Sequence, residues 1–350
     1  MTLRFGVAAY SFTFGCGFLR RDGRPVVAES MDAYGLARLA SERSLSGIET
    51  PVSGMLPDLS EGAVDRFRET LEASGLSLTV DTGVVELGHL QVILPLAARA
   101  GARVVRATLS TVLEGARAEV VGGWSRYLEE MRSRIIKLRP LLEACDIVLA
   151  LENHQDATSD ELVWLCEAGG DRVGVTLDVA NPLAVGEEPL EFARKVGPWV
   201  RNVHLKDYKV YLTPSGYRLV RCALGEGAVP FLELLPLLQR VAPDASQHIE
   251  LAALHGRHIR LLEEGWWEGY PPRDVRSLVP ALHLVARHAR PADEEWRTPL
   301  ERGAPDEEVT RWEREQFEAS VRYLTAITQC RDERARAEEH VDNPGETEGI

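Results

Sequence analysis

The sequence predicts an α/β protein, a (β/α)8 TIM barrel with a C-terminal helical extension. Short β-rich runs alternate strictly with longer amphipathic stretches, and strict alternation indicates a parallel sheet. Eight such units fit into about 280 residues, which favours a closed barrel over an open doubly wound sheet. No Gly-x-Gly-x-x-Gly turn follows the first run, so the dinucleotide-binding form of the open sheet is disfavoured.

Each expected strand is an apolar, β-rich run, and the eight are Arg4–Tyr10, Gly47–Thr50, Leu76–Asp81, Val104–Leu109, Ile147–Glu152, Val173–Asp178, Val200–Leu205 and Gln247–Leu251. The stretches between them repeat apolar residues at three- and four-residue steps, which predicts helices at Met31–Ser41, Ala63–Ala73, Gln91–Ala100, Trp124–Leu142, Ser159–Ala168, Pro189–Lys195 and Pro230–Val241. Glycines stand where helices should stop, at Gly75, Gly101 and Gly170.

The composition changes after Pro291, so we assign residues 1–290 to the barrel and 291–350 to a charged helical arm with a frayed tail from Ala337. Aromatic residues within the charged segment 293–336 suggest burial, and they are Trp296, Trp312, Phe317 and Tyr323. Two interpretations stay open: the arm packs on a second subunit of a homo-oligomer, or it is a loosely docked, solvated helix.

Charge and cysteine content exclude several classes of protein. The 350 residues hold 40 Lys and Arg against 54 Asp and Glu, and a net charge of −14 disfavours nucleic acid as a partner. The five cysteines are scattered and form no Cys-x-x-Cys pair, which predicts free thiols rather than disulfides or a zinc–thiolate site. No signal peptide or membrane-length apolar run is recognisable, so we expect a cytoplasmic protein without a membrane partner.

Function in a barrel gathers at the carboxyl ends of the strands. Strands five to eight end on Glu152, Asp178, His204 and Glu250, each after an apolar run. Three carboxylates and an imidazole at one level would raise one another's pKa values, and a divalent cation relieves this conflict. The sequence therefore predicts one metal site held by these four residues. Oxygen ligands with one nitrogen favour Mn²⁺, Mg²⁺ or Co²⁺, with Mn²⁺ preferred and Zn²⁺ as a further alternative.

Residues two apart on a strand point to the same side, so His154 and Lys206 should face the metal one step nearer the mouth. They are candidate catalytic residues, or else a loop histidine and a partner of a ligating carboxylate. His248 is expected to be a core histidine below Glu250. Weaker candidates, which equally fit a polar lining of the mouth or its cover, are Glu49, Asp81, Arg106, Asn181, Tyr208, Arg218, Arg221 and the aromatic cluster Trp266, Trp267 and Tyr270.

Four ordered fragments together resemble the xylose isomerase-like TIM-barrel superfamily, and within it the sugar phosphate isomerase/epimerase group. They are Leu151-Glu152-Asn153-His154, Thr176-Leu177-Asp178-Val179-Ala180-Asn181, Val203-His204-Leu205-Lys206-Asp207 and Ile249-Glu250. The resemblance covers residues 4–285. It implies the Glu-Asp-His-Glu metal site named above, and it implies that Glu152 and Glu250 also move the proton. The DNA-repair branch of the superfamily carries extra histidines where this chain has Glu49, Asp81 and Asn181, so a nuclease is disfavoured.

The resemblance and the site residues together predict an enzyme that acts on a sugar or sugar-acid derivative through an enediolate stabilised by the metal. The first expectation is an isomerase or epimerase, in which Glu152 and Glu250 serve as acid and base. A lyase on the same site is the alternative, either a decarboxylase of a 3-oxo sugar acid or a dehydratase. In the decarboxylase, Lys206 or His154 would hold the carboxylate or protonate the intermediate. A sugar-binding protein on a catalytically dead barrel would show broken metal ligands, and none is seen.

Overall fold

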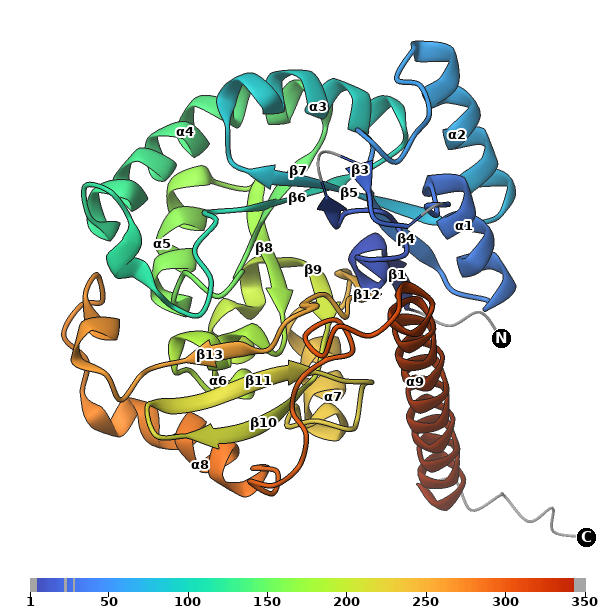
Figure 1. The fold of residues 1–350 in the computed structure, drawn as a ribbon. Coiled ribbons are helices and arrows are strands. Elements are labelled where there is room, and N and C mark those ends of the chain that lie inside the picture. The colour runs from blue at the N-terminus through green and yellow to red at the C-terminus, as the bar shows by residue number, and fades with distance from the viewer. Residues whose placement is uncertain (1–4, 22–23, 28, 343–350) are drawn as a thin grey trace, which may run out of the picture.

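The computed structural model describes residues 5–21, 24–27 and 29–342, and within them eight parallel strands close into a barrel. The strands follow one another around the barrel in the order β1-β12-β9-β8-β7-β6-β5-β4. Figure 1 shows the helices arranged around the outside of these strands. The predicted fold class is therefore confirmed. No helix within these residues is long and apolar enough to cross a membrane.

All eight predicted strands are present, with ends that shift by a few residues. The barrel strands are β1 (Gly6–Ala8), β4 (Gly47–Pro51), β5 (Ser77–Val84), β6 (Val104–Thr108), β7 (Val148–Glu152), β8 (Val173–Asp178), β9 (Val200–Leu205) and β12 (Ser246–Ile249). A short hairpin of β2 (Arg20–Arg21) and β3 (Arg24–Pro25) lies outside the barrel. The five cysteines are free thiols, as predicted.

The seven predicted helices are also confirmed. They are α1 (Ala33–Glu42), α2 (Glu61–Ala73), α3 (Leu87–Arg99), α4 (Trp124–Cys145), α5 (Ser159–Gly169), α6 (Pro189–Val196) and α7 (Phe231–Val241). Six short 3-10 turns complete the connections: η1 (Ala9–Phe12), η2 (Arg117–Glu119), η3 (Asn181–Val185), η4 (Gly197–Trp199), η5 (Glu264–Trp267) and η6 (Val275–Leu278). Gly75, Gly101 and Gly170 all adopt positive φ just beyond helix ends, which explains the choice of glycine there.

A three-stranded antiparallel sheet, which the sequence interpretation missed, stands beside the mouth of the barrel. It consists of β10 (Tyr208–Thr213), β11 (Gly216–Arg221) and β13 (Arg257–Ile259). Asp207 fixes its base, because its carboxylate accepts backbone N–H bonds from Tyr208, Gly225, Gly227 and Val229 at 2.9–3.0 Å. The hairpin and the following loop are therefore tied directly to the end of β9.

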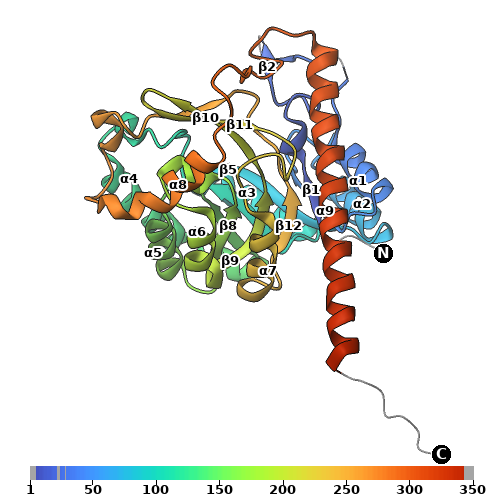
Figure 2. The same cartoon turned by 90° about the horizontal axis from the view of Figure 1, so that it is seen from below.

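The first half of the C-terminal helix α9 (Asp306–Asp342) packs against the barrel. Arg43, just after α1, pairs with Glu318 at 2.7 Å, and the Tyr323 ring meets the Phe231 ring at the start of α7. Helix α9 thus occupies the place between α7 and α1 that closes the outer ring, while α8 (Val279–Arg287) lies beside β10 (Figures 1 and 2).

This packing accounts for part of the predicted arm. Phe317 is fully buried in the main core against Phe12, so the first half of α9 is not loosely docked, and its buried face is not available for a subunit contact. Its second half extends beyond the barrel in Figure 2. The tail expected to fray from Ala337 is helical to Asp342, and residues 343–350 lie outside the described part of the chain.

Candidate metal centre at the mouth of the barrel

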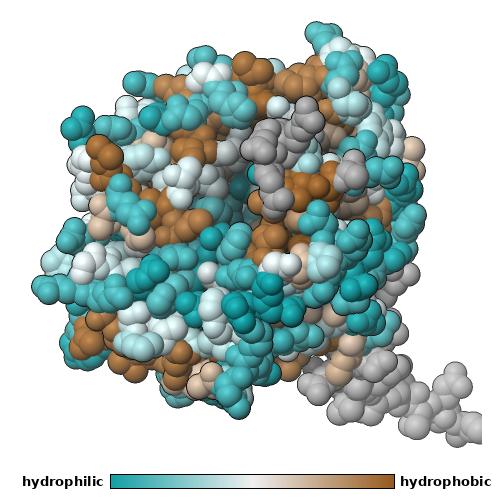
Figure 3. Space-filling model, in the orientation of Figure 1, coloured by the Kyte–Doolittle hydropathy of each residue, from teal (hydrophilic) through white to brown (hydrophobic). Residues whose placement is uncertain are grey.

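Three of the four predicted ligands converge at the carboxyl ends of neighbouring strands. Glu152 ends β7, Asp178 ends β8, and His204 is paired with Asp178 in the β8–β9 register. One oxygen of each carboxylate and one ring nitrogen of His204 lie within 4.8 Å of one another, and all three residues are buried. Figure 3 shows a hollow near the centre of this face of the molecule.

Glu250 follows β12 directly and lies outside that group of three. Its carboxylate makes an ion pair with the ammonium of Lys206, which also contacts Asp178 Oδ2 at 2.8 Å. Lys206 is buried, and although burial lowers its pKa, Asp178 and Glu250 outweigh that effect and hold the pKa well above its usual value. The charged Lys206 ammonium therefore lies between Glu250, the predicted fourth ligand, and Asp178, one of the other three.

His204 is oriented by Glu49 on β4. The two oxygens of Glu49 lie 2.9 and 3.0 Å from His204 Nε2, and this bond assigns the ring proton to Nε2 in the neutral imidazole. Nδ1 then faces Glu152 Oε1 at 3.4 Å without a hydrogen bond. A lone pair directed at a carboxylate is stable only with a cation between them. That cation is either a metal ion or the second ring proton, since Glu49 and Glu152 outweigh burial and raise the pKa of His204.

Arg106 on β6 contacts three carboxylates, and one of them belongs to the proposed ligand Glu152. Its guanidinium lies 3.2 Å from Glu49, 3.1 Å from Asp81 and 3.0 Å from Glu152. Burial alone would raise the pKa of Glu152, but the neighbouring positive charge, foremost that of Arg106, more than offsets burial and keeps this carboxylate ionised. Asp81 is less well compensated, and burial raises its pKa to about 7.

The cluster as a whole is short of positive charge. With His204 neutral, Arg106 and Lys206 face five buried carboxyl groups: Glu49, Asp81, Glu152, Asp178 and Glu250. Burial raises the pKa of Asp178 to about 6 and that of Asp81 to about 7, so Asp81 is only partly ionised at neutral pH and the cluster still carries excess negative charge. Uncompensated charge is costly in a protein interior, and a divalent cation would offset it. The donor set of carboxylate oxygens and one imidazole nitrogen therefore fits Mn²⁺, Mg²⁺, Co²⁺ or Zn²⁺.

We expect Glu49→Gln to weaken binding of Mn²⁺ roughly 10- to 100-fold, because a carboxylate that orients a metal-binding histidine contributes to affinity in this range. Competition with a fluorescent chelator measures the change. Asp81→Asn, compared at pH 8 where Asp81 with its pKa of about 7 is mostly ionised, is the matched control, since it also removes a buried negative charge but Asp81 makes no hydrogen bond with His204. Equal losses in the two variants would show that charge alone, and not orientation of the imidazole, sets the affinity.

His154 is the remaining predicted catalytic residue, and it lies two residues beyond Glu152. Its Nδ1 has no hydrogen-bond partner among the described residues, and burial lowers its pKa.

The backbone is strained just after both glutamates, because the non-glycine residues Gln155 and Ala253 adopt φ values of 76° and 93°. Strain of this kind gathers at functional sites, where the surrounding structure has to maintain it.

Several weaker candidates have structural roles. His248 is a core histidine as expected, with Nδ1 3.0 Å from Asn202 Oδ1. Trp266 donates to the Glu114 carbonyl and stacks on Tyr270, and so covers one side of the barrel. Glu49 and Arg106, which the sequence indicated only as weaker candidates, contact His204 and Glu152 directly. Both are charged residues within short apolar strands, a pattern that indicates the barrel interior but does not predict these contacts.

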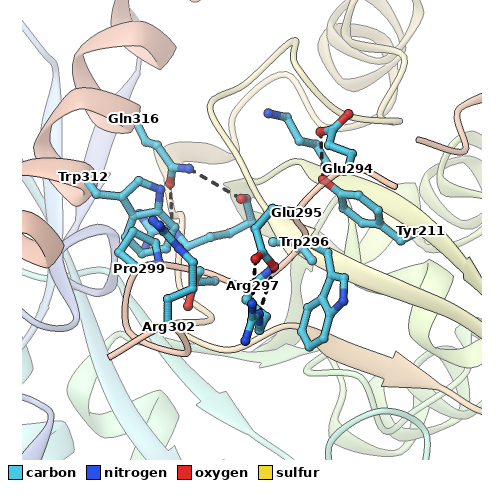
Figure 4. A pocket seen from close by; sticks show the side chains of 13 residues that line it. Tyr211, Glu294, Glu295, Trp296, Arg297, Pro299, Arg302, Trp312 and Gln316 are labelled. Carbon is cyan, nitrogen blue, oxygen red and sulfur yellow. Dashed lines mark hydrogen bonds and ion pairs between the residues drawn. The ribbon is translucent and has the colours of Figure 1, made fainter. Parts of the chain in front are cut away.

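A second cavity, of about 390 Å³, lies on the other face of the three-stranded sheet (Figure 4). Tyr211 of β10, residues 294–299 and the Trp312 and Gln316 side chains of α9 line it. Its charged groups have partners within the lining or just outside it: Arg297 pairs with Glu295, Arg302 pairs with Glu308, and the Tyr211 hydroxyl donates to Glu294. No cluster of buried carboxylates lies among the described residues of this lining, which distinguishes it from the centre at the mouth.

Comparison with curated proteins finds a distant relative. The Escherichia coli (strain K12) protein YihM, itself uncharacterised, is 24% identical over 217 residues. These residues are 61% of this chain and 64% of YihM, so the chain matches somewhat less than two thirds of that relative's length.

Comparison with solved structures finds the same fold. D-psicose 3-epimerase from Clostridium cellulolyticum H10, solved with D-tagatose, gives a TM-score of 0.56 at 15% identity and covers 82% of this chain and 99% of its own. A xylose isomerase-like TIM barrel protein from Mycobacterium smegmatis in complex with magnesium gives 0.53 at 18% identity, over 82% and 97%.

The family assignment rests on the sequence as well as the fold. The model of one family matches residues 37–251, which is more than half of the chain and includes all four predicted ligands. The closed eight-stranded barrel agrees with this match. The chain therefore belongs to the xylose isomerase-like TIM-barrel family.

Proposed function

We propose that this protein is an enzyme that uses one divalent metal ion to isomerise or epimerise a sugar or sugar-acid derivative. The observation that carries the proposal is the buried cluster at the mouth, where five carboxylates face two cations and His204 directs a free ring nitrogen at Glu152. The family's solved members include a sugar epimerase and a magnesium-bound protein, which supports the same reading.

Glu152, Asp178, His204 and Glu250 would hold the ion. When bound, it would polarise a substrate carbonyl and make the neighbouring carbon more acidic. Glu152 ends β7 and Glu250 directly follows β12. The strands β8 and β9 lie between β7 and β12 in the barrel, so the two carboxylates can approach a substrate from different sides. One would remove the proton on the carbon next to the carbonyl, and the other would return a proton to the product.

Lys206 and His154 would assist from the wall of the mouth. The ammonium of Lys206 already contacts Glu250 and Asp178, so it can stabilise negative charge that develops on a substrate oxygen nearby. A neutral His154, favoured by burial, can accept or donate a hydrogen bond.

The buried ammonium of Lys206 also supports a second candidate function. A cation beside Glu250 would hold the carboxylate of a 3-oxo sugar acid, and the chain would then be a decarboxylase. A dehydratase would use the same residues. We also propose a cytoplasmic location, which fits five unpaired thiols, and a small-molecule rather than nucleic-acid partner, which fits the net charge of −14.

Solvent deuterium exchange tests the proposal. Full-length protein loaded with Mn²⁺ is incubated in D₂O with ketoses, sugar acids and their phosphates, and Mn²⁺ is removed before NMR spectra are recorded. We expect deuterium at the carbon next to the carbonyl for at least one substrate, and no exchange after treatment with a chelator. Release of CO2 or water without an isomeric product would instead establish the second candidate. Exchange that persists in metal-free protein would contradict metal dependence.

A further inference from the structure

The three-stranded sheet presents one face to the mouth of the barrel. In its register Val210 pairs with Leu219, and Leu219 pairs with Arg257 of β13. Directly paired residues share a face, and so do residues two apart on one strand, which places Tyr208 on this face as well. Tyr208, Val210 and Leu219 are fully buried, so the face is directed inward and carries Arg257 with it.

Arg257 has no partner for its charge. Its side chain makes no hydrogen bond or ion pair with any residue in 5–21, 24–27 or 29–342, and its Nε atom is buried without an acceptor. Other arginines around the mouth are satisfied: Arg117 pairs with Glu161, and Arg260 pairs with Glu114. A half-buried guanidinium without an acceptor is costly, and an incoming anion would provide one.

The inward face connects Arg257 to the metal centre through Tyr208. The Lys206 ammonium lies 5.9 Å from the centre of the Tyr208 ring, and Arg257 is close enough to act on the hydroxyl electrostatically. That hydroxyl donates to Asn181 Oδ1 at 3.2 Å, while Asn181 Nδ2 is buried without an acceptor. Two residues near the Tyr208 hydroxyl, Arg257 and Asn181, therefore each have a donor without an acceptor, and Tyr208 itself lies next to Lys206.

We infer that the substrate carries an anionic group, a terminal carboxylate or phosphate, which Arg257 binds on the inward face with Asn181 as a second donor. The inference rests on the proposed function, because it names the class of sugar derivative that the metal centre takes. The guanidinium offers parallel N–H donors that match either kind of oxyanion, and the amide of Asn181 supplies one more. The carbonyl end of the substrate would then lie towards Lys206 and the carboxylates.

Isothermal titration calorimetry of the Mg²⁺-loaded full chain tests the inference with three probes: D-fructose, D-fructose 6-phosphate and D-fructuronate. We expect one or both anionic probes to bind at least tenfold more tightly than D-fructose. Comparison of D-fructose 6-phosphate with D-fructuronate shows whether the site prefers a phosphate or a carboxylate. Arg257→Gln should weaken binding of the preferred anionic probe roughly 10- to 100-fold, because it removes a charge-assisted contact, and should leave D-fructose within twofold.

Arg218→Gln is the matched control, since Arg218 belongs to the same sheet but stacks on Trp296 on the opposite face. It should bind all three probes as the unaltered protein does, and thermal melting verifies that both variants fold. The inference is overturned if the neutral probe binds as tightly as both anions, or if the two variants weaken anion binding equally. Binding needs no turnover, so absence of deuterium exchange with intact anion preference would contradict the proposed function and leave this inference standing.

Discussion

Replacing Glu152 or Glu250 by glutamine should lower turnover by about 10²- to 10⁴-fold even at saturating metal. Glutamine keeps an oxygen ligand but cannot take up a proton at neutral pH. Burial raises the pKa of a carboxylate, but Arg106 beside Glu152 and Lys206 beside Glu250 outweigh it and lower the pKa of each. Both carboxylates are thereby ionised in the resting protein, so either can act as the base, and the one that returns a proton must first take it up from solvent. Steady-state rates and loss of deuterium exchange measure the effect.

Metal occupancy has to be matched across these variants, and inductively coupled plasma mass spectrometry provides that measurement. Glu187→Gln is the control, because Glu187 is a partly buried carboxylate that only accepts hydrogen bonds from Ser159. We expect it to keep full activity. If both site variants remained fully active at equal occupancy, neither glutamate would be the base, and the role would pass to Lys206 or His154.

Phe317→Ala should lower the free energy of unfolding by about 3–5 kcal/mol, the usual result of removing a buried phenyl ring from a core. Phe317 is fully buried and meets Phe12 with 5.1 Å between ring centroids. Urea denaturation followed by circular dichroism measures the change. Leu232→Ala on α7 removes an apolar side chain that is 66% exposed, and we expect it to cost less than about 0.5 kcal/mol.

A similar small effect in both variants would show that α9 adds nothing to the barrel. The mass in solution provides a separate measurement, because a subunit contact through the arm would have to use the exposed face of α9 or its second half. If Phe317→Ala changed the mass in solution but not the stability of the subunit, Phe317 would contact a second subunit, contrary to its packing in the core.

The barrel and the convergence of three of the proposed ligands were predictable because they depend on local patterns. A parallel strand buried on both faces is a short apolar run, and its last residue reaches the mouth wherever the helices pack. Glu152, Asp178 and His204 needed only that rule. Glu250 obeyed it too, but Lys206 now stands between its carboxylate and Asp178, and no spacing in the sequence indicates which neighbour an ammonium will choose.

What could not be predicted depends on contacts between residues far apart in the chain. Glu49 and His204 are 155 residues apart, and their hydrogen bond exists only once the barrel closes. The β10–β11 hairpin did carry a local signal, because an alternating run around Ser215-Gly216 is typical of a tight turn. Because strands and helices alternate strictly elsewhere in the chain, the sequence interpretation placed this segment in a loop.

The position of α9 also bears on how the chain folds during synthesis. The carboxylate of Glu313 accepts hydrogen bonds from the backbone N–H groups of Phe14 and Gly15, and the first of these bonds spans 299 residues. Residues 14 and 15 therefore lack these partners until a segment made about 300 residues later has been synthesised. Before α9 is in place, Phe12 and Phe231 also lack the aromatic rings that pack against them, so the partly made barrel exposes apolar surface at which it can associate with other chains.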